Sequence, residues 1–599
     1  MKARFLTAVL VSLIGFIGMA RAETSLKEFL RTYELKPIRS YTFLGTEKSN
    51  HQLWTGKAGD HYDKPTVEAN GLICGWFDPG EHVPWVKEAM KTGAYDFGLV
   101  DGYLPAVRYV YGRGGKNETC EMTAFAVDSP QPGRIFVYVS LAENVGDKAG
   151  TVRYFRLGDT MPADRAAFEA ALQNLRDRWT KFFAQGAPVA CDDPDVVNAC
   201  KASIIRALIT FTGKRPHYGV RSYGPGRPYG PDYGDGFPPT IIALADCLLD
   251  WGHAPLAREY LTAYFDVFVR DDGRIRYYID PKVDGCSVAE YGQFLWLVRK
   301  CIDEGGSRTW LDHLRPKLER IRARFWEERA KSPAGLISGG PEADLRHQVG
   351  VYFHNNGWAW RGLRDIAPLL GHEDDAARCK SFRKTIAAAI DKAAVRSVTP
   401  MFIPPMPEKT PFNTVAPFRT MTENEFASFT NYRYWPELLS CSILSKEQTE
   451  AVIDYRNSHG GDVAGLAHFC DHADNWPLVE YAAGLRSLGR MDEVRRLLYC
   501  HLAGHTTPQT WTAYEQVGIT GSPLRTGPQA DYCVPVQLVA PRLAAWLWKK
   551  DRPRGDARAG SVKYADNPAL PAARTGKLGG AVNDSHHECS NARSTDERN

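Results

Sequence analysis

The sequence lacks three features that would assign it to a common class: a Cys-x-x-Cys pair, an excess of one charge, and a long apolar run beyond its first residues. Its 74 basic and 70 acidic residues give a net charge of +4 without a basic stripe, so we expect no nucleic-acid partner. No stretch after the first 22 residues is apolar enough to span a bilayer, so we expect no stable membrane insertion.

The first 22 residues have the pattern of a secretory signal peptide. Lys2 and Arg4 precede an apolar run from Phe5, and Ala20-Arg21-Ala22 fits the small-x-small cleavage rule. We therefore expect cleavage before Glu23 and a secreted or periplasmic protein. The thirteen cysteines are an odd number, so at least one thiol is unpaired within a monomer.

One short cluster has metal-binding residue types. His468, Cys470 and His472 lie together in HFCDH, but no second ligand group follows at a recognisable spacing. We therefore expect no metal and no other cofactor.

The spacing of apolar residues changes along the chain, from a strand-like pattern in the N-terminal part to a helical pattern after it. From about residue 40 to 160, short runs alternate polar and apolar residues between Gly, Pro and Asp, which predicts a β-sandwich over 23–163. The apolar spacing then changes to three and four residues, which predicts a linking helix over 164–190. The last segment, 551–599, is charged and rich in Gly, Pro and Ser, so we expect a disordered tail that is dispensable for folding.

Between residues 191 and 550, nearly every apolar segment has a helical period. Many segments form pairs in which the first helix is apolar or aromatic and the second carries a charged stripe, which indicates a buried inner and an exposed outer layer. Their unequal, loop-separated units do not repeat at a fixed period, which argues against an open solenoid. Six such hairpins predict an (α/α)6 toroid with twelve helices, near 194–213, 239–251, 255–269, 286–303, 308–329, 349–370, 373–394, 431–443, 446–457, 475–488, 490–503 and 530–548.

Three stretches carry a family resemblance: PYGPDYGDGFPP at 228–239, GLISGGPEADLRHQVGVYFHNNGWAWRGL at 335–363, and WTAYEQV followed by ADYCVPVQL near the end. With them, the chain resembles the six-hairpin glycosidases, the superfamily of glucoamylases, trehalases and processing α-glucosidases, over roughly residues 160 to 550. The resemblance implies a general acid at Asp344, with Glu342 as a near alternative, a general base at Glu515, and inversion. It lacks the Trp-Asp-Ser motif of trehalase-like enzymes, with Asp232 and Asp235 in its place, so the subfamily stays unassigned.

The chemistry of these acidic residues supports the catalytic roles, but some of them also have a structural explanation. Hydrolysis of a glycosidic bond uses two carboxyl groups, about 6.5–9.5 Å apart in an inverting enzyme. Asp344 has the alternative role of a helix cap, and Glu290 that of a hydrogen-bonded residue of an inner helix. The residues that we expect to bind substrate are aromatic or polar residues near these acids: Asp232, Tyr233, Asp235, Trp358, Arg433, Tyr434, Trp511 and Tyr514.

The sequence therefore predicts a secreted glycoside hydrolase that acts on an oligo- or polysaccharide in an aromatic-lined cleft. One alternative is a toroidal polysaccharide lyase that uses His354, Asn355, Arg433 and Tyr434. The other is a carbohydrate-binding protein without catalysis. The sugar, the linkage and the oligomeric state stay open.

Overall fold

The computed structural model describes residues 25–35, 41–50, 53–54, 61–146, 148–187, 189–220, 236–277, 287–342, 348–407, 418–519 and 532–549. Contacts divide the chain into two units, Met1–Lys550 and Asp551–Asn599, and every described residue belongs to the first. The predicted signal peptide and the predicted tail lie outside the described residues. None of the helices in the described part is long and apolar enough to cross a membrane.

The N-terminal region is built on one five-stranded antiparallel sheet. Its strands follow one another in chain order: β5 Tyr95–Leu99, β6 Ala106–Gly112, β7 Glu118–Asp128, β8 Ile135–Val145 and β9 Lys148–Leu157. Each strand pairs with the next through a short connection, as the alternating runs between turn residues predict. The sheet is therefore a meander with local connections.

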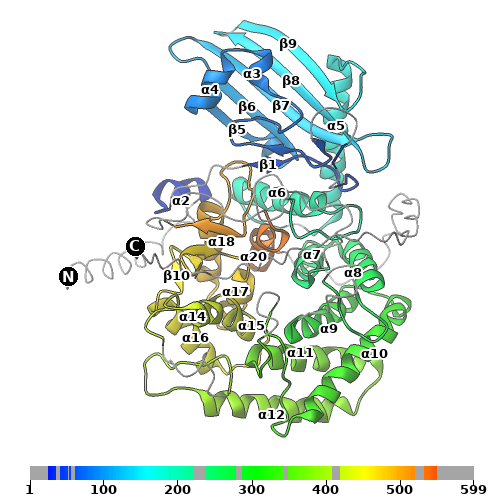
Figure 1. Cartoon of the computed structure of the whole chain (residues 1–599), viewed down its shortest axis with the longest axis vertical. Helices are drawn as coiled ribbons and strands as arrows, with labels where there is room; N and C mark the ends of the chain where they lie inside the picture. Colours follow the sequence, from blue (N-terminus) through cyan, green and yellow to red (C-terminus); the bar gives the residue numbers. More distant parts are fainter. Residues whose placement is uncertain are drawn as a thin grey trace, which may run out of the picture. The chain divides into compact units, whose positions relative to one another are not determined.

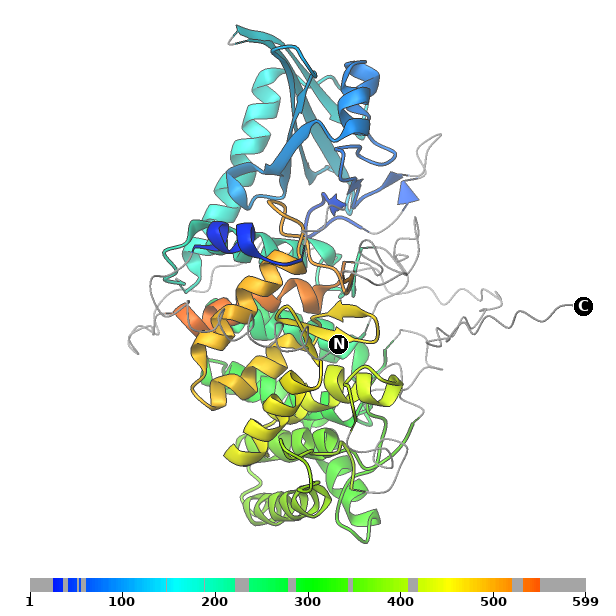
Figure 2. The same ribbon diagram turned by 90° about the vertical axis from the view of Figure 1, so that its left-hand side faces the viewer.

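Helices cover both faces of this sheet. On one face, Phe155 packs against Phe77, next to α3 (Pro79–His82), and α4 (Val86–Thr92) contacts β6. On the other face, Phe125 and Tyr138 pack against Phe168 of α5 (Arg165–Gln185). Figure 2 shows the sheet from its side, with α5 on one side and the short helices on the other.

The predicted β-sandwich is not confirmed. Besides the meander, the described strands of this region form two two-stranded pairs, β1 (Thr42–Phe43) with β4 (Thr66–Val67) and β2 (Leu53–Trp54) with β3 (His61–Tyr62). A short helix, α2 (Leu26–Thr32), precedes them. Period-two alternation reports that a strand buries one side chain in two; it does not report whether a second sheet or a helix covers that face.

The twelve predicted helical segments all contain helices. Their bounds are α6 Pro194–Thr210, α7 Pro238–Asp250, α8 Ala254–Phe268, α9 Val288–Asp303, α10 Arg308–Lys331, α11 Phe353–Leu370, α12 Asp375–Ala393, α14 Glu425–Phe429 continuing through the π-helical turn η3 Thr430–Tyr434 into α15 Trp435–Ser440, α16 Lys446–Ser458, α17 Leu478–Ser487, α18 Met491–Gly504, and α19 Val534–Gln537 followed by α20 Val539–Trp548. One short 3-10 turn, η2 (Val100–Gly102), lies in the N-terminal region.

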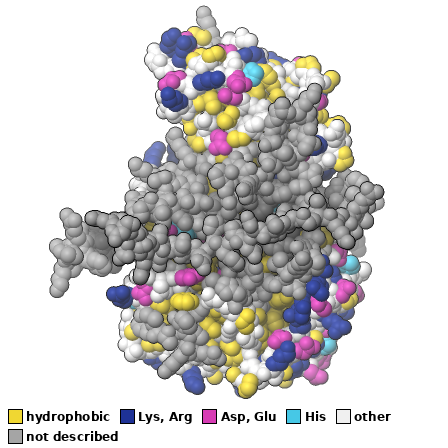
Figure 3. All heavy atoms as spheres, viewed as in Figure 1, with side chains coloured by type: hydrophobic (Ala, Val, Ile, Leu, Met, Phe, Trp, Pro, Cys, Tyr) yellow, Lys and Arg dark blue, Asp and Glu magenta, His cyan; other side chains and the backbone are white. Residues whose placement is uncertain are grey.

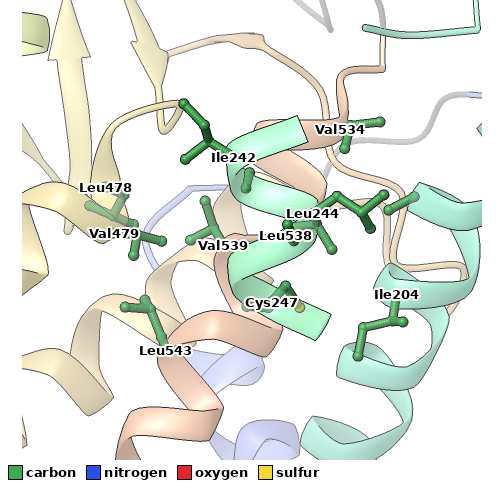
Figure 4. Packing of buried hydrophobic residues seen from close by; sticks show 14 of the residues in the cluster. Ile204, Ile242, Leu244, Cys247, Leu478, Val479, Val534, Leu538, Val539 and Leu543 are labelled. Atoms are coloured by element: carbon green, nitrogen blue, oxygen red, sulfur yellow. The ribbon is translucent and has the colours of Figure 1, made fainter. Parts of the chain in front are cut away.

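Six of these helices contact one another in a closed cycle. In order, α7, α9, α11, α15, α17 and α20 each contact the next, and α20 contacts α7 again. The other helices pack around this cycle, which Figure 1 shows. Figure 4 shows the closing contact, where Leu538, Val539 and Leu543 meet Leu244 of α7 and Val479 of α17. We call the cycle the inner ring.

The predicted order of inner and outer helices starts with an inner helix at 194–213 and an outer helix at 239–251, and it is displaced by one helix. The first helix, α6, lies outside the ring and packs on α19 and α20, so the first inner helix is α7. The apolar pattern of α6 predicted an inner helix because α6 is almost as buried as one: α2 and η2 pack on it. The segment 214–238 therefore leads from an outer to an inner helix.

The outer helices carry the charged surface. Along α10, Arg315 pairs with Asp312 and Lys331 with Glu328. In Figure 3, basic and acidic side chains are interspersed among the described residues of the visible face. This distribution agrees with the nearly balanced charge of the sequence.

The connections are long at one end of the ring and short at the other. Those that enter inner helices span 211–237, 269–287, 332–352, 394–424, 459–477 and 505–533. Those that leave inner helices span only 251–253, 304–307, 371–374, 441–445 and 488–490. Because inner and outer helices alternate in direction, all long connections lie at the N-termini of the inner helices. We call this end the mouth.

The mouth also carries a small antiparallel sheet that the sequence did not predict. It orders β10 (Asp462–Val463), β11 (Leu466–Phe469), β12 (His472–Asp474) and β13 (Gln516–Gly518). Residues from two long connections thus pair with each other. The strands hold two to four residues each, too few for alternation to reveal.

A buried ionic network joins four inner helices. Lys300 of α9 lies 2.5 Å from Asp246 and 2.6 Å from Asp250, both of α7. Arg542 of α20 lies 3.0 Å from Asp246 and 3.5 Å from Glu480 of α17. Burial opposes the ionisation of Asp246, but Lys300 and Arg542 outweigh it and hold the pKa of Asp246 below its ordinary value.

We expect Lys300→Met to lower the free energy of unfolding by about 3–5 kcal/mol, because it leaves Asp246 and Asp250 buried without their shared cation. Urea unfolding followed by circular dichroism measures the change. Lys331→Met is the matched control, since Lys331 and Glu328 are exposed, and its effect should stay below about 1 kcal/mol. Equal effects of the two substitutions would contradict the role of the network.

Candidate active site

The mouth of the ring contains a second buried cluster, separate from the main core and rich in aromatic residues. Its members come mainly from the long connections and the first turns of inner helices. They are Tyr218, Tyr352, Met406, Phe429, Tyr432, Tyr434, Phe469, Trp476, Ala513, Cys533 and Val536, with Phe237, Phe426 and Cys470 packed against them. We call this set the mouth cluster.

Arg433 lies against the largest ring of the mouth cluster. Its guanidinium is 3.8 Å from the centroid of the Trp476 ring, a cation–π contact in a buried setting. The Tyr432 ring lies 4.4 Å from that of Phe469 and 6.2 Å from that of Trp476. The η3 segment and the 459–477 connection are therefore packed together through aromatic rings.

Arg433 also joins two buried carboxyl groups from different inner helices. Its Nη2 atom is 2.9 Å from Oε1 of Glu437 and 3.5 Å from Oε1 of Glu290. Glu437 follows Arg433 by four residues, so both lie on one face of the helix that η3 and α15 form. Burial disfavours the charged guanidinium, but Glu437 and Glu290 outweigh it and raise the pKa of Arg433.

Glu290 is held by donors from its own connection. Its Oε2 atom accepts hydrogen bonds from the hydroxyl of Tyr277 at 2.9 Å and from the backbone N–H of Ser287 at 2.8 Å. The second bond belongs to a capping box at the start of α9, in which the hydroxyl of Ser287 accepts from the N–H of Glu290. This agrees with the structural reading of Glu290 as a hydrogen-bonded residue of an inner helix.

His354 of α11 lies between Glu437 and the connection that carries Glu342. Its Nε2 atom is 3.1 Å from the carbonyl oxygen of Pro341 and 3.5 Å from Oε2 of Glu437. Because a carbonyl only accepts, Nε2 carries the proton that it donates to Pro341. The imidazole also stacks on the Tyr434 ring, with centroids 5.0 Å apart.

The burial of these groups changes their proton affinities in opposite directions. Burial lowers the pKa of His354 to about 3, so its imidazole is neutral. Burial raises the pKa of Glu437 to about 8; Arg433 opposes this rise, and the carboxylates of Glu290, Glu480 and Glu342 add to it. A carboxyl group that keeps its proton near neutral pH therefore lies in the mouth.

Glu342 is the predicted acid that the structure describes. It is 5% exposed, and it lies in the connection that enters α11. Burial and then the charge of Glu342 raise the pKa of Tyr352; burial, then Tyr352 and then the charge of Glu342 raise the pKa of Tyr434. Glu342 therefore lies within electrostatic range of two aromatic members of the mouth cluster.

Glu515 lies in the connection that enters α19. It is 8% exposed, and it precedes β13 directly. Burial raises the pKa of Cys533, a member of the mouth cluster, and the charge of Glu515 is the next cause of that rise. The predicted base thus also lies within electrostatic range of this cluster.

The two aromatic residues near Glu515 pack elsewhere. The hydroxyl of Tyr514 donates to the carbonyl of Tyr41, and the two rings meet edge to face at 5.3 Å. Tyr514 and Trp511 both belong to the main core, not to the mouth cluster.

The other predicted residues divide into three groups. Arg433 and Tyr434 lie in the mouth, as described above. Trp358 lies in the main core, with its ring 5.7 Å from that of Trp296 and 4.9 Å from the guanidinium of Arg361. Asp232, Tyr233, Asp235 and Asp344 lie outside the described residues.

The sequence missed Glu437 and Trp476, and named His354 only for the lyase alternative. One signal was present: YRYWPELL places an acid four residues after an arginine in an otherwise apolar helix, which indicates a buried ion pair. Glu290 and His354, which lie near Arg433 and Glu437, and Pro341, which contacts His354, are far away in the sequence. Spacing alone therefore does not reveal the cluster.

The HFCDH stretch includes the end of β11, a two-residue turn and the start of β12. Its His468 Nδ1 lies 2.9 Å from the carbonyl oxygen of Gly460, and its His472 Nδ1 lies 3.1 Å from Oδ1 of Asp471. Within the described ranges, three or more His, Cys, Asp or Glu residues are nowhere grouped so as to hold a metal ion. Eight cysteines of these ranges are free thiols: Cys120, Cys200, Cys247, Cys301, Cys379, Cys441, Cys500 and Cys533.

We expect Tyr277→Phe to lower the free energy of unfolding by about 1–3 kcal/mol, because the buried carboxyl of Glu290 loses its hydroxyl donor. Thermal or urea unfolding measures it. Tyr154→Phe is the control: Tyr154 of β9 packs its ring on Phe168 but is partly exposed, so water solvates the surroundings of its hydroxyl. An effect of Tyr277→Phe no larger than that of the control would contradict the interpretation.

Comparisons with known proteins give distant structural neighbours only. No protein-family model matches the chain, and no curated protein matches it. A bacterial glucoamylase complexed with acarbose is 11% identical, with 86% of this chain and 85% of that chain covered and a TM-score of 0.44. A rhamnosidase from Klebsiella oxytoca with rhamnose bound is 11% identical, with 87% and 98% covered and a TM-score of 0.42. A GH78 family rhamnosidase of Bacillus sp. GL1 is 12% identical, with 73% and 46% covered and a TM-score of 0.41. A glucoamylase, a kind of enzyme that the sequence resembles, is thus among them, but likenesses of this degree assign no activity to the chain.

Proposed function

We propose that the chain is a glycoside hydrolase that cleaves an oligo- or polysaccharide at the mouth of the inner ring. One observation carries the proposal: Glu342 and Glu515 come from two different long connections, and the charge of each acts on members of the same aromatic cluster. Two carboxyl groups are what cleavage of a glycosidic bond requires.

The proposed reaction is general acid/base hydrolysis with inversion. Glu515 activates a water molecule as the base, and Glu342 or Asp344 protonates the leaving oxygen. Inversion requires carboxyl groups about 6.5–9.5 Å apart, with room for the water between them. Acids on separate connections reach such a spacing when a closed ring brings those connections to one end.

The proposed contacts with the sugar are aromatic and polar. Tyr434, together with Trp476, offers rings at the mouth, and Asp232, Tyr233 and Asp235 stay proposed contacts from the connection that enters α7. Arg433 is engaged by Glu290 and Glu437, so we assign it the support of Trp476. Trp358, Trp511 and Tyr514 pack in the core, and we assign them support of the surrounding backbone.

The domain limits and the location are part of the proposal. We place the activity in residues 191–550, after a strand-rich region at 23–163 and a linking helix at 164–190. The signal-peptide pattern of residues 1–22 supports a secreted or periplasmic enzyme.

The lyase alternative has less support from the contacts of its candidates. The side chain of Asn355 accepts from the N–H of Ala289 and donates to the carbonyl of Gly340, so it is occupied by backbone. Arg433 is paired with two carboxyl groups, whereas a lyase needs a cation that faces a uronate. The other alternative, a carbohydrate-binding protein without catalysis, would bind the sugar but would not hydrolyse it.

We expect Glu515→Gln to lower kcat by about 10²–10⁴ with little change in KM, because the amide keeps its size but accepts no proton. Glu342→Gln and Asp344→Asn identify the acid: the correct one loses activity on natural linkages but keeps it on substrates whose leaving group needs no protonation. Turnover of an oligosaccharide panel, with product anomers followed by proton NMR, measures both the rate and the stereochemistry.

The control is Glu493→Gln, which removes a carboxylate paired with Arg490 on α18. It should leave kcat unchanged. Near-normal turnover of Glu515→Gln would refute the assignment of the base. An unsaturated product that absorbs in the ultraviolet would favour the lyase.

A further inference from the structure

The proton on Nε2 of His354 has two acceptors within reach. The carbonyl of Pro341 lies at 3.1 Å and Oε2 of Glu437 at 3.5 Å. Pro341 directly precedes Glu342, so the first contact fixes the backbone beside a proposed acid. Which acceptor holds the proton depends on whether Oε2 of Glu437 is itself protonated.

We propose that Glu437 is a positioning residue: its protonated carboxyl leaves the Nε2 proton of His354 to Pro341 and thereby fixes the segment that carries Glu342. The inference rests on the proposed acid role of this segment. When Glu437 loses its proton, its anionic Oε2 competes with a neutral carbonyl for one N–H. Charge-assisted hydrogen bonds are the stronger kind, so His354 turns toward Glu437 and the Pro341 contact weakens.

The geometry around Glu437 favours the protonated form. Its Oε1 atom faces Arg433, which is the cation that opposes protonation. The other charged groups that act on it are carboxylates from each neighbouring element: Glu290 of α9, Glu480 of α17 and Glu342 of the connection before α11. His354 of α11 is neutral. One guanidinium, shared with Glu290, thus faces several acids in a buried site, and full ionisation would leave uncompensated negative charge.

The sign of the pH effect follows from the raised proton affinity. The pKa of Glu437 lies above its ordinary value, so the stabilisation that the protonated form gives is present at low pH and disappears as pH rises through about 8. The Pro341 contact should therefore hold at neutral pH and be lost in alkaline solution.

The test measures the protection of the backbone beside Glu342 from hydrogen exchange, and it does not depend on catalytic activity. Hydrogen–deuterium exchange of full-length protein, corrected for intrinsic rates, is followed for residues 337–342 between pH 6 and 9.5. In the wild type, protection should fall above pH 8 by up to about tenfold per pH unit, as the loss of one coupled proton dictates. Unchanged protection across this range would overturn the proposal without any variant.

Two variants separate the steps of the proposal. Glu437→Gln keeps the shape but does not ionise, so protection of residues 337–342 should stay constant to pH 9.5, and the alkaline limb of the kcat profile should move upward by at least one pH unit. His354→Phe keeps the ring on Tyr434 but removes the N–H, so it should show the low protection of the alkaline state at every pH. A pH-dependent loss of protection that survives in either variant would contradict the proposal.

Glu319→Gln is the matched control, because Glu319 of the outer helix α10 pairs at 2.8 Å with Nε2 of His372, which lies in the connection 371–374. It should change neither the exchange of residues 337–342 nor the alkaline limb. The two proposals fail in different ways. If the protein hydrolyses no saccharide, the exchange data still decide the role of Glu437. If exchange does not depend on pH while Glu515→Gln abolishes hydrolysis, only the role of Glu437 falls.

Discussion

The structure depends on the pairing of buried charges across the inner ring. Inner helices are apolar on most sides, yet α7, α9, α15 and α20 each carry an ionisable residue that is buried. Each such charge finds its partner on another helix: Lys300 on α7, Arg542 on α7 and α17, and Arg433 on α9 as well as on its own helix. Because an unpaired buried charge costs several kcal/mol, the ring is stable only when these helices stay in register.

The same register sets the site. Glu290, His354 and Glu437 lie on three successive inner helices. The first two of these helices, α9 and α11, approach each other closely. A Cβ atom on Gly292 would lie 2.2 Å from the carbonyl oxygen of Trp358, and one on Gly362 would lie 2.6 Å from the carbonyl oxygen of Gly292. These glycines therefore permit a helix spacing that larger residues would not, and this spacing brings α11 and its His354 against the residues of α9.

The sequence predicted where the helices lie in the chain, but it did not predict which elements pack against one another. A helical period records how each segment divides between core and solvent, so all twelve segments were found from the sequence. Which element covers a face is a long-range property: α6 read as inner because α2 and η2 cover it, and the meander read as half of a sandwich because α5 takes the place of a second sheet. For the proposed site, the sequence named Glu342, Arg433, Tyr434 and Glu515, and their roles stay predictions. The role proposed for Glu437 depends on His354 and Pro341, which lie about a hundred residues earlier in the chain.

The N-terminal region contributes to the mouth although it supplies none of the proposed acids. The hydroxyl of Tyr514, next to Glu515, donates to the carbonyl of Tyr41, and Nζ of Lys64 donates to the carbonyls of Ile209 and Phe211 at the end of α6.

Arg206 completes this attachment, because it donates to the hydroxyls of both Thr42 and Thr512. Two of the long connections, 211–237 and 505–533, are thus tied to residues 41–64 by buried hydrogen bonds. Buried polar groups lose a large part of their solvation, so these bonds hold only while both regions are folded. The position of the segment that carries Glu515 is therefore a property of the N-terminal region and the ring together, and the strand-rich region acts as part of the support of the proposed active site.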